Sequence, residues 1–501
     1  MTTAPAAAPP RSADRGKDTG VIAILLVATF VMILNETIMG VALPRLMVSL
    51  RIDATTAQWL TGAFLLTMAV VIPTTGFLLQ RLSTRRVFLT AMALFCTGTL
   101  LAGVSPGFWL LLVARIVQAS GTAIMLPLLM TTILTLVALE RRGRVMGNVS
   151  IVISVAPAIG PTLSGLILQY LPWRFMFLLV LPVALTALGI GAKRLVNVGE
   201  VGHQRLDLVS VALTVPAFGG VVFGLSRIGE SGSGSSLALA VTSLVVGVVC
   251  LVAFGWRQVA LQDRGYPLLD LRVFRFPMFR VGVALLAVTM MGLFGMIILL
   301  PLYLQNIRGL GSLATGLLLL PGGLLMGLLA PTVGRLFDRY GPRGLATTGA
   351  VAITLVLWRF SAVTSGTPIW QLLALHIAMS LGLACLFTPG FTTALNPLPS
   401  HLYSHGSATT TTLQQVAGAA GTALLITVLT ARSLRASQEG ASAVVAQAAG
   451  LHTAFLVAAG IAIVAVVLAL FMRAPRPGEH GGESAPVTQE AVSGAEAPAA
   501  P

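Results

Sequence analysis

The stretch from Val21 to Leu43, which reads VIAILLVATFVMILNETIMGVAL, decides the fold of this 501-residue chain. It is apolar except for a short interruption that contains Glu36. A helix of about 20 mainly apolar residues crosses the hydrocarbon of a bilayer. The stretch directly follows the polar, Ala- and Pro-rich residues 1–19, and it is too long for the apolar region of a cleavable signal. We therefore interpret it as a first membrane span.

The rest of the chain has the same apolar character. Hydrophobic residues make up 56% of it and charged residues only 9%, whereas soluble domains carry about 25% charged residues. Such a chain cannot cover a soluble surface, so it is predicted to be a polytopic membrane protein. The net charge of +15 indicates basic cytoplasmic loops. No nucleic-acid partner is expected, because no polar domain is available to bind one.

Fourteen apolar runs are long enough to span a bilayer. They are continuous and do not alternate with polar residues, which favours helices over barrel strands and predicts an all-α fold. The expected spans are residues 21–43, 58–80, 86–104, 107–130, 145–169, 174–192, 207–226, 236–256, 280–304, 314–334, 344–362, 369–395, 406–430 and 452–472.

The basic residues give the expected orientation. Of 31 Lys and Arg residues, 22 fall in segments on the side of the N-terminus, 8 on the opposite side and one inside a span. The positive-inside rule then places both termini in the cytoplasm and the protein in the cytoplasmic (inner) membrane. Residues 1–20 and 473–501 are expected to be disordered tails.

Two loops repeat one pattern at a distance of 258 residues. Residues 80–86 read QRLSTRR after Gly76, and residues 338–343 read DRYGPR after Gly334. The repeat predicts two six-helix halves, residues 21–192 and 280–472. The linker, residues 193–279, would then hold two extra helices, at 207–226 and 236–256. Repeated halves are typical of transporters, whose substrate site lies between them.

The repeated loops resemble the signature between spans 2 and 3 of the major facilitator superfamily. Residues 112–121 resemble its span 4 motif, and residues 34–44 resemble the span 1 motif of its fourteen-span drug/proton antiporters, in a branch similar to lincomycin exporters. The first loop departs from the family by having Gln80 in place of Asp. The loop signature maps here onto Gly76, Arg81, Arg85, Gly334, Asp338, Arg339 and Arg343.

A fifth-span motif adds to the resemblance. Residues 147–165 are similar to the antiporter motif of the superfamily, with matching or substituted positions at Gly147, Ala156, Gly160, Pro161 and Gly165. The resemblance implies a major facilitator fold, alternating access gated by packing around this motif, and a monomer. It also implies transport driven by the proton gradient, without a cofactor. No nucleotide-binding loop is present in the sequence.

Two embedded charges are the candidates for proton coupling. Glu36 is the only one of sixteen acidic residues that lies well inside an expected span, and Arg115 is the only embedded base. Ionisable groups in a membrane are costly and usually functional, and an apolar surrounding favours a neutral carboxyl group. Both residues lie about 12 Å from the outer surface at 1.5 Å per residue. A direct or water-mediated pair is therefore open, as is a packing role for either residue.

A drug-binding site is expected to be apolar and aromatic with a few polar groups. The three cysteines lie apart in apolar runs, so no metal site is expected. The alternative for each Met and aromatic candidate is packing within the bundle or contact with lipid. The candidate substrate-binding residues are Asn35, Met39, Trp59, Phe64, Gln118, Met291, Phe294 and Tyr303.

The resulting hypothesis is proton-coupled export of small hydrophobic substrates, neutral or monocationic, such as drugs or antibiotics. An exporter of a single endogenous metabolite, such as an antibiotic made by the same cell, is the alternative. A membrane enzyme would need clusters of His or acidic residues inside the spans. One embedded acid and scattered histidines argue against an enzyme.

Overall fold

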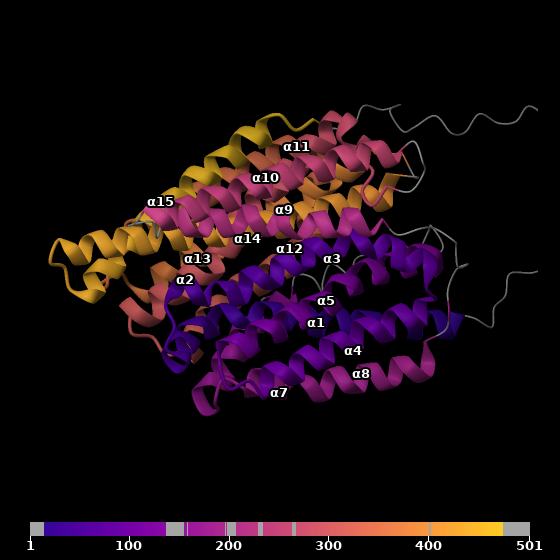
Figure 1. Ribbon diagram of the computed structural model, residues 1–501. Coiled ribbons are helices and arrows are strands. Elements are labelled where there is room, and N and C mark those ends of the chain that lie inside the picture. Colours follow the sequence, from indigo (N-terminus) through magenta and orange to yellow (C-terminus); the bar gives the residue numbers. More distant parts are fainter. Residues whose placement is uncertain are drawn as a thin grey trace, which may run out of the picture.

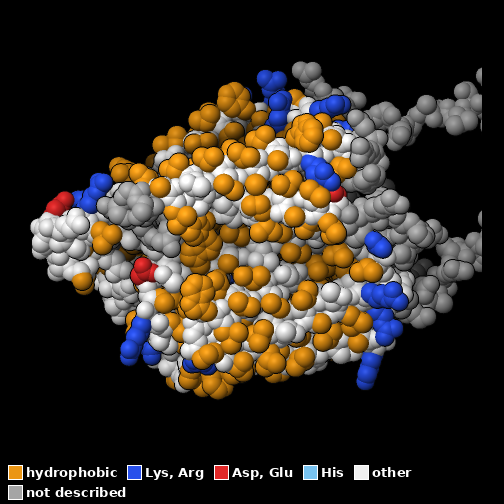
Figure 2. All heavy atoms as spheres, viewed as in Figure 1, with side chains coloured by type: hydrophobic (Ala, Val, Ile, Leu, Met, Phe, Trp, Pro, Cys, Tyr) orange, Lys and Arg blue, Asp and Glu red, His pale blue; other side chains and the backbone are white. Residues whose placement is uncertain are grey.

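The computed structural model describes residues 15–136, 155–157, 159–195, 197, 207–228, 234–262, 267–399 and 402–473. Within these residues every regular element is helical and none is a strand. The long helices lie side by side in one elongated bundle (Figure 1). On the face shown in Figure 2, Lys and Arg side chains gather toward the two ends, and hydrophobic side chains cover the length between them. This distribution suits a molecule whose sides face lipid.

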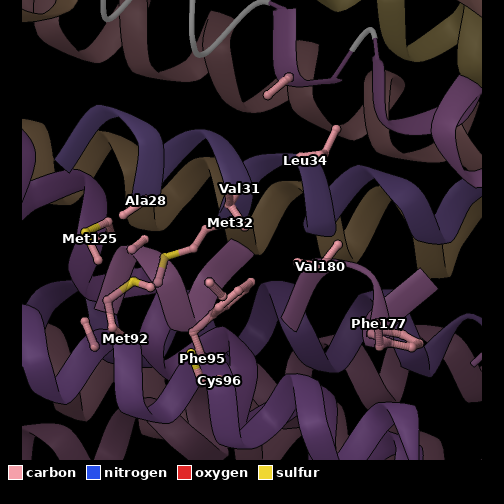
Figure 3. Packing of buried hydrophobic residues seen from close by; sticks show 14 of the residues in the cluster. Ala28, Val31, Met32, Leu34, Met92, Phe95, Cys96, Met125, Phe177 and Val180 are labelled. Carbon is pink, nitrogen blue, oxygen red and sulfur yellow. The ribbon is translucent and has the colours of Figure 1, made fainter. Parts of the chain in front are cut away.

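The N-terminal helices pack around a shared apolar core. Met32, Met92 and Met125 come from three different helices and point toward one another in Figure 3, with Phe95 beside them. Met92 and Met125 are buried in this core together with Met32, which faces the interior of the half. The helices are α1 (Arg15–Leu50), α2 (Ala54–Ala57), α3 (Trp59–Arg81), α4 (Thr84–Gly103), α5 (Phe108–Leu136), α7 (Phe175–Leu178) and α8 (Val180–Arg194). Residues 155–157 and 159–170 are also helical.

The C-terminal helices form a second group, orange to yellow in Figure 1, beside the N-terminal one. Its apolar core joins α11, α12, α13, α14 and α15. The elements are η1 (Leu271–Arg275), α11 (Pro277–Leu302), η2 (Tyr303–Ile307), α12 (Ser312–Phe360), α13 (Ile369–Leu395), α14 (Tyr403–Gln438) and α15 (Ala443–Leu470). The two groups meet where α1 contacts α11 and where α3 contacts α14.

Local sequence signals set several helix ends. Asp53 caps α2 by accepting a hydrogen bond from the Thr56 backbone N–H at 2.8 Å, as short polar side chains do at helix starts. Pro277 opens α11, where its missing N–H is not needed. Gly440, with φ of 88°, follows the end of α14, because glycine adopts this left-handed conformation without a steric penalty.

Two helices that lie between the groups in the sequence form a tight hairpin. They are α9 (Leu208–Ile228) and α10 (Gly234–Gln262). A Cβ atom added to Gly220 would lie 2.7 Å from the Ser243 carbonyl oxygen, so the two backbones are in close contact. α9 packs against α3 and α14, whereas α10 packs against α9 and η1. In the most apolar 18-residue stretch of α10, only 17% is buried inside the protein. The hairpin therefore lies on the side of the bundle.

Twelve helices among the described residues are long and apolar enough to cross a membrane. Two expected spans are not among the twelve. One, residues 145–169, falls partly outside the described residues. The other, residues 344–362, is the second part of α12, which continues as a helix after a kink at Gly341 with φ of 75°. The count of fourteen therefore stays a prediction.

The expected N-terminal boundary is wrong for a few residues. Residues 15–20, expected to be disordered, form the first turns of α1. Adding residues to an existing helix costs much less than starting one, so the helix extends beyond its apolar run. Residues 1–14 and 474–501 lie outside the described residues.

Candidate functional site

Arg115 lies within α5 and is 0% exposed. Its Nη1 donates hydrogen bonds to Asn35 Oδ1 at 3.1 Å and to Gln118 Oε1 at 2.7 Å. Its Nε donates to the backbone oxygen of Leu60 at 3.3 Å. One buried cation thus joins α5 to α1 and α3.

The groups that contact Arg115 directly in the described structure are neutral. The guanidinium carbon lies 4.0 Å from the ring centroid of Phe64, a distance typical of a cation–π contact. Gln118 in turn donates from Nε2 to Thr99 Oγ1 at 2.8 Å, and Thr99 donates to the Phe95 oxygen at 2.6 Å. Because a buried charge needs polar partners, these oxygens and the ring stabilise the cation without a salt bridge among the described residues.

Glu36 lies on a different side of α1 from Asn35, since neighbouring residues in a helix are rotated by about 100°. It shares a stripe with Gly40, one turn later. A Cβ atom at Gly40 would lie 2.6 Å from the Ile297 side chain of α11, so this stripe faces the C-terminal helices. Glu36 is half-buried. It is therefore directed toward the junction of the two helix groups.

Glu36 and Arg115 are near enough for a Coulomb interaction. Within the described part of the chain, no salt bridge or hydrogen bond joins them, and the guanidinium is bonded to Asn35 instead. A water-mediated or direct pairing in another state, one of the alternatives that the sequence left open, is not tested by these contacts. The structure brings Asn35, Phe64 and Gln118 together around Arg115, and all three are buried.

The other substrate candidates lie elsewhere. Phe294 and Met291 of α11 pack against α14, where a Cβ atom at Gly418 would lie 2.8 Å from the Phe294 ring and one at Gly421 would lie 2.5 Å from Met291 Cα. Tyr303 is buried and donates its hydroxyl hydrogen bond to the Thr364 oxygen at 2.7 Å. Met291 and Tyr303 pack the C-terminal helices together, and Phe294 also lies in a buried cluster with Leu65 and Ala69 of α3.

The last two substrate candidates, Met39 and Trp59, also have packing contacts. Met39 is buried in the core of the N-terminal helices. The Trp59 ring lies 6.0 Å from the ring of Phe223 on α9, at 41° between planes. Trp59 therefore contacts the hairpin, and neither residue is bonded to the Arg115 network in the described structure.

The fifth-span motif lies where the two helix groups touch. A Cβ atom at Gly160 would clash with Thr37 of α1, and one at Gly165 would clash with the Ser312 oxygen of α12. Thr162 donates a hydrogen bond to the Gly316 oxygen at 2.9 Å. Ala156 lies in the helical residues 155–157 and Pro161 in the helical residues 159–170, and Gly147 is outside the described residues. The small residues allow this close contact.

The loop signature is described only in part. Arg85 donates from Nη2 to the Ala192 oxygen at 2.5 Å, which ties the start of α4 to the end of α8. Arg339 lies over the Tyr340 ring at 5.4 Å. Arg343 is exposed. The side chain of Asp338 lies outside the described residues, so its part in the loop signature stays a prediction.

Sequence reasoning missed two sets of polar residues. Thr99 supports Gln118, but an isolated threonine in an apolar run carries no signal of this kind. The run TTTTLQQ at residues 409–415 of α14 does carry one, because seven consecutive positions in an expected span include six polar side chains. Searching the spans for neutral polar residues as well as charges would have identified it.

Multi-pass helices in two packed groups, with a buried cation in one group and a half-buried carboxyl group facing the other, define a membrane transporter of the two-bundle class. The chain belongs to the Major Facilitator Superfamily, whose family model matches residues 25–422.

Similar proteins agree with this assignment. The chain is 41% identical over 462 residues to an uncharacterised MFS-type transporter, YcnB, of Bacillus subtilis, covering 92% of this chain and 96% of that protein. It is 41% identical over 459 residues to the lincomycin resistance protein LmrB of Listeria monocytogenes, covering 90% and 96%. A bacterial homologue of the human lysosomal transporter Spinster, in an inward-facing conformation, shares the fold. Its TM-score is 0.67 at 12% identity, with 91% of this chain and 97% of that chain covered.

Proposed function

We propose that this protein exports small hydrophobic drugs or antibiotics across the cytoplasmic membrane in exchange for protons. The observation that carries the proposal is the position of Glu36. It is the only acidic residue well inside an expected span, and it is half-buried on the stripe of α1 that faces α11. A carboxyl group at a junction that opens and closes is suited to taking a proton on one side and releasing it on the other.

Arg115 supports this role through its remaining hydrogen-bonding capacity. Its Nη2 is buried and has no hydrogen-bond partner among the described residues. Deprotonated Glu36 would gain this donor as a partner, whereas protonated Glu36 would leave Arg115 on Asn35 and Gln118. Loss of the proton would therefore change the contact between α1 and α5, and the gradient would supply the driving force without a cofactor.

The membrane arrangement forms part of the proposal. Helical residues follow the kink at Gly341, and residues 159–170 are helical, which supports fourteen spans in place of the twelve counted. The bias of basic residues supports cytoplasmic termini. We propose a monomer with two six-helix halves, residues 21–192 and 280–472, and a linker hairpin.

The substrate class is supported by the relatives. The protein named for lincomycin resistance favours an antibiotic or drug. One carboxyl group suits neutral or monocationic substrates, because it cannot neutralise two charges at low dielectric. Export of a single metabolite made by the cell is the alternative. Competition among unrelated drugs for transport of one labelled drug would separate the two, since a single-substrate exporter shows no such competition.

The test is uphill drug efflux in proteoliposomes under an imposed pH gradient. Glu36→Gln mimics a permanently protonated residue and should reduce gradient-driven transport at least about tenfold, whereas Glu36→Asp should keep part of it. Gln371→Leu serves as a control for purification and reconstitution, because Gln371 lies near the start of α13 and outside the expected site. Uphill transport by Glu36→Gln at the native rate would show that proton coupling lies elsewhere.

A further inference from the structure

Residues 409–422 of α14 carry five polar side chains that are packed inside the protein and each have a buried atom without a hydrogen-bond partner among the described residues. They are called the Thr/Gln row here. Side-chain atoms of all five have no hydrogen-bond partner in the described part of the chain. Thr412 is 2% exposed, Gln414 5% and Thr422 1%. The row consists of Thr409, Thr412, Gln414, Gln415 and Thr422.

The missing partners are unusual for threonine in this bundle. Most threonines in the long helices donate to a backbone oxygen one turn earlier. In α14 itself, Thr410 donates to the Gly406 oxygen at 2.8 Å and Thr411 to the Ser407 oxygen at 2.9 Å. The hydroxyl groups of Thr409 and Thr412 do not make this bond. A buried polar group without a partner is costly, so the row should gain partners in another state of the protein.

The row lies at the contact between the two helix groups. Ala408 of α14 packs against a cluster that includes Phe64 of α3 and Ala119 of α5. Thr412 and Gln415 stand four and seven residues further along, so they share the stripe of Ala408. The same stripe continues to Ala419, which packs against α3. The row is therefore placed at a surface that separates when the two halves move apart.

The row is close to the candidate site in the N-terminal helices. Phe64 belongs to the cluster that contacts Ala408, and its ring also covers the guanidinium of Arg115. Gln414 stands four residues before Gly418, on the side of α14 where Phe294 packs. A substrate between the halves would contact the row on one side and Phe64 on the other.

The chemistry of the row is neutral. Residues 406–431 of α14 contain no ionisable side chain. Hydroxyl and amide groups donate and accept hydrogen bonds, so together they match hydroxyl, ether and amide groups of an uncharged solute. They offer no attraction to a cation that has no hydrogen-bonding groups.

We propose that the Thr/Gln row recognises the substrate, and that it selects neutral solutes with hydroxyl and amide groups. This inference rests on the proposed function as an exporter and names the substrate class of that site. Charge coupling then belongs to the N-terminal half, and recognition of neutral polar groups belongs to α14.

Equilibrium binding to the purified full chain in detergent tests the inference without a proton gradient. The probes are chloramphenicol, an uncharged molecule with two hydroxyl groups and an amide, and tetraphenylphosphonium, a cation without hydrogen-bonding groups. Thr412→Val and Gln415→Leu should each weaken chloramphenicol binding about five- to tenfold, as expected for one lost hydrogen bond, and change tetraphenylphosphonium binding less than about twofold.

Matched variants keep this test specific. Thr410→Val removes a hydroxyl that is already bonded within the same helix, so it should change neither probe by more than about twofold. Thr412→Ser retains the hydroxyl and should bind chloramphenicol like the native protein, which separates recognition from a folding defect.

Three results would overturn the proposal: no chloramphenicol binding by the native protein, equal loss of both probes in Thr412→Val, or an equal effect of Thr410→Val. Failure of proton-coupled export would appear only in the gradient assay and would leave these binding results interpretable.

Discussion

Two sets of buried polar groups, one in each half, are bonded to different extents. In the N-terminal half a full charge, Arg115, is 0% exposed and is bonded to three oxygens and covered by an aromatic ring. In the C-terminal half α14 buries neutral hydroxyl and amide groups that have no partners among the described residues. The difference teaches that burial alone does not identify a working site. A charge with three hydrogen bonds holds its half together, whereas neutral groups without partners indicate a surface that changes partners.

The largest effect is expected from removing the buried charge of Arg115. Arg115→Met leaves the oxygens of Asn35, Gln118 and Leu60 without their donor, at a cost of about 1–3 kcal/mol for each buried acceptor left unpaired. Uphill transport should fall to background and the melting temperature should drop. Thermal unfolding in detergent together with proteoliposome efflux measures both. Arg115→Lys should be intermediate, since an ammonium group lacks the planar fork.

A variant in the other half serves as the control for Arg115. His376 of α13 makes one hydrogen bond, to the Leu319 oxygen at 3.0 Å. His376→Leu should cost about 1–2 kcal/mol and leave the dependence of transport on the gradient unchanged. Native stability and transport in Arg115→Met would remove the contrast between the halves.

A smaller effect is expected from close packing, and it should be equal in both halves. A Cβ atom at Gly121 would lie 2.3 Å from the Ala91 oxygen, and one at Gly421 would lie 2.5 Å from Met291 Cα. Gly121→Ala and Gly421→Ala should each lower the free energy of unfolding by about 1–3 kcal/mol. Chemical denaturation, followed by tryptophan fluorescence, measures this change.

Each glycine has a matched control in its own half. Gly62 and Gly292 have nothing within 4 Å of an added Cβ atom, so Gly62→Ala and Gly292→Ala should be within about 0.5 kcal/mol of the native protein. A large loss in one half only would mean that the halves do not unfold as equivalent units.

The smallest effect is expected at the base of the hairpin, which lies outside both halves. Arg257 donates to Asp207 from Nε and from Nη2, each at 2.6 Å. These hydrogen bonds, with help from Ser210, lower the pKa of Asp207 from 3.8 to about 2. Because the folded pKa is lowered, the stabilisation is complete above about pH 4 and is lost as the pH falls toward 2.

The hairpin should therefore not respond to pH in the range that drives transport. Amide hydrogen exchange in residues 208–262, corrected for the intrinsic rate, should be the same at pH 5 and pH 8. Asp207→Asn should increase exchange at both values and change transport less than about twofold. Exchange that differs between pH 5 and pH 8 in the native protein would assign the hairpin a part in proton coupling.

Features that depend on the composition of a single helix could be predicted from the sequence. Apolar runs predicted the helices, because the cost of exposing backbone to lipid leaves few alternatives. Counting charges found Glu36 and Arg115, because an embedded charge is rare for energetic reasons. The kink at Gly341 was also anticipated as a boundary, since the expected spans separate there, although α12 runs through it.

What depends on helix rotation and long-range contacts was not predictable. Asn35 and Glu36 are neighbours in sequence, yet only Asn35 is bonded to Arg115, and a rotation of α1 by one residue would exchange them. Phe294 packs over Gly418, more than a hundred residues away in the sequence. No pattern within α11 contains that information.

Because α9 packs on one side of the bundle, the two junctions between the helix groups are not equally exposed to lipid. Phe218 and Val222 of α9 are buried in a cluster with residues of α3 and α14. The two groups also touch where Thr162 meets Gly316, and the contacts of the hairpin are with α3, α14 and η1. On the side where α3 and α14 meet, α9 therefore covers the junction of the two groups and separates it from solutes dissolved among the acyl chains. We expect lateral entry from the lipid phase to be directed to the opposite flank, between residues 159–170 and α12.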